Sequence, residues 1–134
     1  MFKKALSKLK SFESMEIWQL AREINKEIFH LYKSSPLKQD SALWHQMNKA
    51  SGSIMDNIAE GFERNGNKEF RQFLSVAKAS CGELRSQVYR CYDREYLDRQ
   101  RFEQLMGKVF KESRKISLLL SYLSKSGMEG SKFR

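Results

Sequence analysis

The most regular feature of the sequence is a repeat of apolar residues at spacings of three and four, the period of one face of an α-helix. Four segments carry such a stripe. Their members are Ile17, Ala21, Ile24, Ile28 and Leu31; Leu43, Met47, Ala50, Ile54, Asn57 and Gly61; Phe70, Leu74, Ala77, Cys81, Leu84, Val88 and Cys91; and Phe102, Leu105, Val109, Ile116, Leu119 and Leu123. No stretch alternates between apolar and polar residues for long enough to predict a strand. Four helices with short connections must lie beside one another in alternating directions, so the sequence predicts an all-α, antiparallel up-down-up-down four-helix bundle.

Turn and capping residues stand at the ends of these helices. Pro36 ends the first helix, because the residue before a proline is pushed out of the helical conformation. The segment 64–67 is a turn by composition. Side chains that can accept a hydrogen bond from the first turn predict the helix starts. The expected caps, in chain order, are Ser14, Asp40 or Ser41, Asn67 and Asp98.

The chain of 134 residues has the length of one domain. Its pattern divides it into a basic N-terminal extension over residues 1–12, a four-helix bundle over residues 13–125 and a frayed tail over residues 126–134. Two glycines, Gly127 and Gly130, follow the last stripe and favour this end to the helix.

The chain is strongly basic, with 25 Lys and Arg against 16 Asp and Glu and a formal net charge of +9. Residues 1–12 contribute +4 and residues 108–134, with seven basic and two acidic residues, contribute +5, which together equal the whole excess. Such a balance favours polyanions: nucleic acid first, an acidic protein or an anionic membrane second.

Other features point to the cytoplasm. No apolar run approaches the roughly 20 residues that span a bilayer, so a membrane partner is not expected. Residues 1–6 have lysines but no apolar run and cleavage site typical of a signal peptide. Cys81 and Cys91 lie ten residues apart on one helix face, about 15 Å by helical rise, which is too far for a disulfide. We interpret both as reduced core residues.

The chain has more apolar side chains than one bundle can bury. A bundle seam uses about three positions in seven of each helix, and a second apolar face is typical of association with another chain. The sequence therefore predicts a homo-oligomer; the alternative is a monomer with a wide, aromatic-rich core. The residues expected to be exposed are Phe62, Phe73, Tyr89, Tyr92, Phe110, Leu118, Leu120 and Tyr122.

Asn57, Glu60 and Gly61 interrupt the second stripe and form a structural motif. A buried amide destabilises a core unless it is hydrogen-bonded, so we expect Asn57 to fix the register by bonding across helices. Gly61 allows a neighbouring backbone to approach. Glu60 and Arg64 have the four-residue spacing of a helical ion pair. The alternative interpretation is a functional site built around Asn57 and Glu60.

The candidate nucleic-acid-binding residues are basic side chains of the third and fourth helices. In the third helix they follow one stripe, with Ser75 and Gly82 between them and Tyr89, a ring that can stack on a base, continuing the line. In the fourth helix we expect Glu112 to be their only acidic neighbour. The alternative is an ordinary solvated face. The candidates are Lys68, Arg71, Lys78, Arg85, Lys108, Lys111, Arg114 and Lys115.

Motifs for catalysis, metals and cofactors are missing from the sequence. His30 and His45 have no second ligand at metal spacing, and no glycine-rich phosphate loop occurs. A di-metal bundle would need carboxylates on all four helices together with Glu-x-x-His elements. We therefore expect no metal, no cofactor and no enzyme activity. Zinc-finger, RNP and helix-turn-helix signatures are also missing, so any nucleic-acid binding is expected to be non-sequence-specific.

Several segments resemble a known family, the four-helix bundle proteins encoded in intervening sequences of bacterial 23S ribosomal RNA genes. The likeness runs from about Phe12 to Leu123, and its most specific part is the Asn-Ile-Ala-Glu-Gly segment over 57–61. Met55 stands where the family often has proline, and Asn48-Lys49 replaces a usual pair of arginines. The other matching segments are 12–21, Ser53-Ile54, Lys68-Glu69-Phe70, Phe73-Leu74, Ala77, Ser80, Glu83-Leu84 and Gln87.

The resemblance implies an antiparallel four-helix bundle that assembles into a five-membered ring and has no known enzymatic activity. It also implies kinship with accessory proteins of diversity-generating retroelements, which are basic pentameric bundles that bind nucleic acid and a reverse transcriptase. Taken together, the residues and the resemblance predict a pentameric, non-enzymatic scaffold that binds RNA or DNA phosphates. The alternative is a protein–protein adaptor whose basic surface docks an acidic partner.

Overall fold

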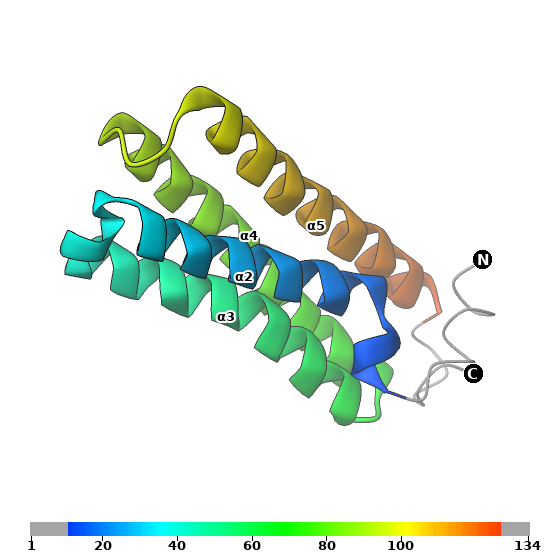
Figure 1. Cartoon of the computed structure of the whole chain (residues 1–134). Coiled ribbons are helices and arrows are strands. Elements are labelled where there is room, and N and C mark those ends of the chain that lie inside the picture. Colours follow the sequence, from blue (N-terminus) through cyan, green and yellow to red (C-terminus); the bar gives the residue numbers. More distant parts are fainter. Residues whose placement is uncertain (1–10, 127–134) are drawn as a thin grey trace.

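The computed structural model describes residues 11–126, and the predicted basic extension and frayed tail lie almost wholly outside this range. Residues 11–126 are all-α and contain no strand (Figure 1). Two short 3-10 helices precede α2 and α3. The elements are η1 (Phe12–Ser14), α2 (Glu16–Ser34), η2 (Pro36–Gln39), α3 (Ser41–Glu63), α4 (Asn67–Asp93) and α5 (Arg99–Lys125).

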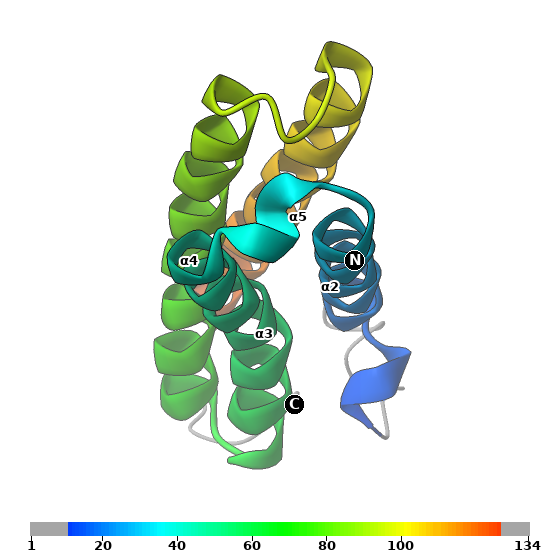
Figure 2. The same ribbon diagram turned by 60° about the vertical axis from the view of Figure 1, so that its left-hand side comes forward.

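Each long helix packs against two others: α2 and α4 each contact both α3 and α5. Figure 2 shows α3 beside α4 along much of their length, with η2 between the ends of α2 and α3. At several places, residues near the end of one helix meet residues near the start of another. These contacts are Tyr32 with Trp44, Asp40 with Arg94, and Asn67 with Leu123. Lys115, in the second half of α5, meets Glu16 at the start of α2.

The core consists of the predicted stripes, and every apolar residue named in them is buried. Asn57 is the exception among the stripe positions, because it is only half-buried and Ile58 occupies the core position beside it. Cys81 and Cys91 are buried free thiols, as expected. Burial raises the pKa of both thiols to about 12.

Two of the predicted caps are confirmed and two are wrong. Asp40 Oδ1 accepts a hydrogen bond from the Leu43 amide at 3.3 Å, and Asp98 caps α5 in the same way. Ser14 ends η1 instead of capping α2, whose N-cap position is taken by Met15 without a side-chain bond. Asn67 is the first residue of α4 and is buried; Gly66 takes the N-cap position, and the Asn67 side chain bonds to Arg71 and to the Leu123 carbonyl instead of a first-turn amide.

The predicted exposed apolar residues divide into three groups. Tyr89, Phe110 and Leu118 are exposed, at 51 %, 49 % and 57 %. Phe62 was expected to be exposed and is only 3 % exposed, because the chain turns after α3 and brings its ring edge-on to Phe70 at 6.2 Å. The remaining four are partly buried, and these are Phe73, Tyr92, Leu120 and Tyr122.

Candidate nucleic-acid interface

Lys68 and Lys78 are the most accessible cations of the predicted α4 stripe. Both are exposed, and neither forms a salt bridge within residues 11–126. The stripe runs from Lys68 to Arg85, 17 residues apart, which corresponds to about 25 Å along the helix. At Gly82, near its end, an added Cβ would meet nothing within 4 Å, so this part of α4 is open to an approaching backbone.

Arg71 and Arg85 are held by neighbouring side chains. Arg71 Nε donates to Asn67 Oδ1 at 2.8 Å, and the Asn67 amide donates to the Leu123 carbonyl of α5 at 3.3 Å. The guanidinium carbon of Arg85 lies 5.0 Å from the centre of the Phe110 ring, within the range of a cation–π contact. Both arginines therefore have fixed positions beside the α4–α5 contact.

The basic residues of α5 are not equivalent. Lys108 Nζ lies 2.8 Å from Glu23 Oε1 and 3.1 Å from Glu27 Oε1, and Lys115 Nζ lies 3.3 Å from Glu16 Oε1. The hydrogen bond to Lys108 lowers the pKa of Glu23 and raises that of Lys108.

The expectation that Glu112 is the only acidic neighbour of these residues is therefore wrong. Their partners come from α2, up to 99 residues away in the sequence. By contrast, Lys111 and Arg114 are exposed and form no salt bridge with any residue between 11 and 126.

Glu112 points into the core. Its residue exposure is 0 %, and neither carboxylate oxygen has a hydrogen-bond partner within the described chain. Burial raises the pKa of this carboxyl to about 8, against the opposing effect of the Lys115 charge. The Glu112 charge also contributes to the raised pKa of Cys81, which places the two groups near one another.

The Asn57 motif differs in part from the prediction. Asn57 Nδ2 donates to the carbonyl of Ser53 at 2.8 Å and to its hydroxyl at 2.9 Å, one turn earlier in the same helix. The expected bond from Asn57 across helices is therefore wrong. The link to α4 is made by Ser53 itself, whose hydroxyl lies 2.8 Å from that of Ser80.

The other two members of the motif behave as expected. Glu60 and Arg64 form an ion pair at 3.1 Å. A Cβ at Gly61 would lie 2.7 Å from the Cβ of Phe73 and 3.0 Å from the Phe70 ring, so only glycine fits this approach of α3 to α4. The contacts of these two residues are a close approach of α3 to α4 and an ion pair at the surface.

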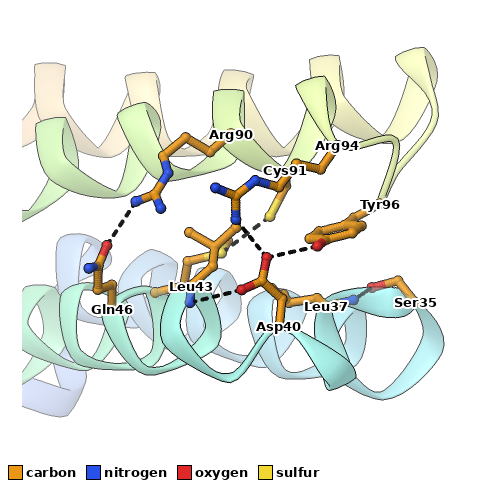
Figure 3. A network of polar contacts seen from close by, with 10 residues as sticks. Ser35, Leu37, Asp40, Leu43, Gln46, Arg90, Cys91, Arg94 and Tyr96 are labelled. Atoms are coloured by element: carbon orange, nitrogen blue, oxygen red, sulfur yellow. Dashed lines mark hydrogen bonds and ion pairs between the residues drawn. The ribbon is translucent and has the colours of Figure 1, made fainter.

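A second polar cluster was not expected from the sequence. Figure 3 shows Asp40 between the first turn of α3 and the segment after α4. Its Oδ2 accepts hydrogen bonds from Arg94 at 2.6 Å and from the Tyr96 hydroxyl at 2.7 Å. The bond from Tyr96 is the main cause of the lowered pKa of Asp40. The partners lie 54 and 56 residues away, so no local signal in the sequence indicates them.

Two further properties of the described chain bear on function. Residues 11–126 hold no group of three or more His, Cys, Asp or Glu side chains placed to bind a metal ion. None of the helices in that range combines the length and the apolar character that crossing a membrane requires.

Comparison with known proteins agrees with the fold. The model of the family described as 23S rRNA-intervening sequence protein matches residues 13–118. The chain belongs to this family. A crystal structure of a protein of unknown function from the S23 ribosomal protein family of Bacteroides thetaiotaomicron VPI-5482 superposes with a TM-score of 0.72. The match covers 78 % of this chain and 97 % of that one at 19 % identity, which supports the shared fold alone. No curated protein matches the chain.

Proposed function

We propose that this intervening-sequence protein is a non-enzymatic, homo-oligomeric scaffold that binds the phosphate backbone of RNA or DNA without reading its sequence. The observation that carries the proposal is the line of cations on α4. Lys68 and Lys78 are exposed and form no salt bridge within residues 11–126, and Arg71 and Arg85 are held in place beside them. Lysines with no acidic partner are free to neutralise phosphates and release their counterions.

We further propose that each subunit is an antiparallel up-down-up-down bundle and that five subunits form a ring in the cytoplasm. The start-to-end contacts between neighbouring helices support the first part. Three exposed apolar side chains on α4 and α5 support association: Tyr89, Phe110 and Leu118. A ring repeats the basic stripe by symmetry, which multiplies the phosphate contacts available to one polyanion. The molar mass in solution from light scattering tests the subunit number, and a single-subunit mass contradicts the ring.

The basic face of α5 makes a smaller contribution in this proposal. Lys108 and Lys115 already bind glutamates of α2, so a phosphate would have to displace a carboxylate. Lys111 and Arg114 are exposed and extend the site beyond α4. We therefore expect neutralisation of Lys111 to weaken binding more than neutralisation of Lys108.

Fluorescence anisotropy with a labelled RNA duplex at two salt concentrations tests the nucleic-acid proposal. The double variant Lys68→Gln with Lys78→Gln removes two exposed charges from each subunit, so we expect weaker binding and a salt slope reduced by about 1 to 2 for each subunit that contacts the duplex. The matched control is Lys38→Gln with Lys49→Gln, which removes the same charge from exposed positions outside the stripe that form no salt bridge within residues 11–126. Equal losses in both variants would show a general charge effect, and no binding by the wild type at low salt would overturn the proposal.

A protein–protein adaptor is the second candidate function. Val76 and Leu118 favour it, because both are large apolar side chains about half exposed on the two helices that carry the cations. An acidic partner with an apolar centre would fit such a surface. Val76→Ser separates the two candidates, since it leaves in place every charge and also Leu118, one of the side chains that support association. Unchanged duplex binding with an unchanged oligomer is the result expected for the nucleic-acid scaffold.

A further inference from the structure

A cluster of aromatic rings lies where α2 meets α3, away from the α4 stripe. Tyr32 and Trp44 stack with their ring centres 4.1 Å apart, and Phe29 lies 6.1 Å from Tyr32 and 6.3 Å from Trp44. Phe29 is 51 % exposed, whereas the other two rings are partly buried. The Lys33 ammonium lies 5.5 Å from the centre of the Phe29 ring. An exposed ring therefore stands on a rigid aromatic base with a cation beside it.

Cations continue along α2 from this cluster. Arg22, Lys26, Phe29 and Lys33 are spaced by four, three and four residues, so they follow one side of the helix over about 16 Å. All four side chains are exposed. The guanidinium of Arg22 lies 5.8 Å from the centre of a further ring, that of Trp18. The surface alternates aromatic and cationic groups along its length.

Few acidic groups are available in the segments that form this surface. Residues 28–55 contain one acidic residue, Asp40, which is bound by Arg94 and Tyr96. The two acids of α2 nearest the cluster, Glu23 and Glu27, are bound by Lys108 of α5. Within residues 11–126, the three cations of the α2 line form no salt bridge. The charge of this surface therefore complements a polyanion.

We propose that the α2–α3 surface formed by Arg22, Lys26, Phe29, Tyr32, Lys33 and Trp44 binds single-stranded nucleic acid by stacking bases on its rings. Exposed rings interleaved with cations are the arrangement that holds unpaired bases, because every base has a π-face and every nucleotide a phosphate. A duplex hides its base faces and cannot use such rings. This surface lies on α2 and α3, whereas the proposed phosphate-binding stripe lies on α4. The proposal goes beyond the proposed function, because the α2–α3 surface distinguishes single strands from duplexes.

Two oligomers of equal charge test the stacking. We expect oligo(dA) to bind more tightly than an abasic deoxyribose-phosphate oligomer of the same length. Phe29→Ala should weaken oligo(dA) binding by about 5- to 100-fold and leave the abasic oligomer and an RNA duplex unaffected. Equal affinities for the two oligomers in the wild type would overturn the proposal.

The chain offers a matched control in Phe110→Ala. Phe110 is 49 % exposed and has the Arg85 guanidinium over its ring at 5.0 Å, so it repeats the exposed ring with a cation on the other side of the protein. Because Phe110 also holds Arg85 of the α4 stripe, this variant can lower the affinity for both oligomers, but we expect it to keep the wild-type ratio of oligo(dA) to abasic affinity. If Phe110→Ala removes the preference for oligo(dA) and Phe29→Ala does not, the single-strand site lies on α4 and α5 and the proposal is wrong.

Fluorescence gives a direct measurement of contact with the cluster. The protein has two tryptophans, so Trp18→Phe leaves Trp44 as the only source of tryptophan emission. We expect oligo(dA) to quench Trp44 and the abasic oligomer to leave it unchanged.

A lower molar mass for Phe29→Ala would mean that the surface is a subunit contact and would overturn the proposal. Duplex binding without any single-strand binding would also overturn it and leave the α4 proposal standing.

Discussion

The contact between α3 and α4 and the contacts of α5 are built on different physical terms. Between α3 and α4, Gly61 allows a close approach to Phe70 and Phe73, and the hydroxyls of Ser53 and Ser80 meet at 2.8 Å. Along α5, Lys108 and Lys115 bind glutamates of α2 at the surface, while a pocket of about 300 Å³ remains near the ends of α2 and α5. The first contact depends on shape, and the second depends on charge.

Two carboxyl groups, one in each region, have pKa values shifted in opposite directions. Asp40, at the start of α3, has a lowered pKa because Tyr96 and Arg94 donate hydrogen bonds to it. Glu112, on α5, has a raised pKa because it is buried without a partner in the described chain. We therefore expect acid to weaken the α3–α4 junction by protonating Asp40. Alkali should weaken the attachment of α5 by ionising Glu112.

Alkaline destabilisation through Glu112 is the largest effect we expect. The folded protein keeps this proton up to a pKa of about 8, whereas the unfolded chain releases it near 4.5, so stability falls as pH rises between these values. Between about pH 5 and about pH 9 the free energy of unfolding should fall by on the order of 4 kcal/mol. Urea denaturation across this range measures it. Cys81 and Cys91, whose folded pKa values lie near 12, add to this loss only at the top of the range, where pH passes the unfolded thiol pKa of about 8.5.

The variant Glu112→Gln shows whether this carboxyl causes the slope. It should flatten the alkaline loss of stability, while Glu83→Gln, at an exposed position of α4, should leave the loss unchanged. Hydrogen exchange should locate the effect, with amides of α5 exchanging faster at alkaline pH before those of α3. An equal slope in wild type and Glu112→Gln would remove Glu112 from the explanation.

A substitution at Gly61 should produce the next largest effect, on the other side of the comparison. In Gly61→Ala the new Cβ would lie 2.7 Å from the Cβ of Phe73, which cannot rotate away, so the helices must separate. We expect the free energy of unfolding to fall by about 1 to 3 kcal/mol. The control is Gly82→Ala in α4, where the added Cβ meets nothing and the higher helix propensity of alanine should stabilise by up to about 1 kcal/mol. Equal stabilities of the two variants would contradict the steric account.

The sequence predicted features that depend on one helix and missed those that depend on its partners. The apolar stripes were correct because the period of a helix alone decides which residues share a face. Asp40 and Asp98 were correct as caps because a cap bonds within its own first turn. Asn67 was wrong because Gly66 takes the N-cap position, and the Asn67 oxygen that would cap accepts from Arg71 while its amide donates to the Leu123 carbonyl, 56 residues away.

The candidate site follows the same division. The line of cations on α4 is visible in the sequence, and the structure places Lys68 and Lys78 at the surface. The sequence could not show that Lys108 is bound by Glu23, 85 residues earlier, because the contact exists only after α2 and α5 pack. Phe29 was not among the expected exposed residues. Its ring lies beside Trp44 of the next helix, and this contact likewise exists only after α2 and α3 pack.

Acid sensitivity at Asp40 should be smaller than the Gly61 effect, because solvent reaches this carboxyl. Its folded pKa is lowered, so it stabilises the protein at neutral pH, and this contribution is lost as pH falls through the folded pKa. Asp40→Asn keeps a capping oxygen and removes the charge, so it should be less stable than wild type at neutral pH and equal to it in acid. Asp98→Asn changes a cap that Arg94 and Tyr96 do not reach. Its stability difference from wild type should therefore depend less on pH than that of Asp40→Asn. Parallel pH profiles for wild type and Asp40→Asn would contradict the assignment.

The salt dependence of the α2–α5 contact should be the smallest effect. Lys108, Glu23 and Glu27 are partly exposed, so the ion pairs are screened and Lys108→Gln should lower the free energy of unfolding by less than about 1 kcal/mol at low salt. The difference from wild type should vanish in high salt, whereas the difference caused by Gly61→Ala should persist, since a steric clash is not screened. Urea denaturation of both variants at two salt concentrations measures this contrast. A loss in Lys108→Gln that persists in high salt would mean that its aliphatic stem, packed between α2 and α5, stabilises the contact more than its charge does.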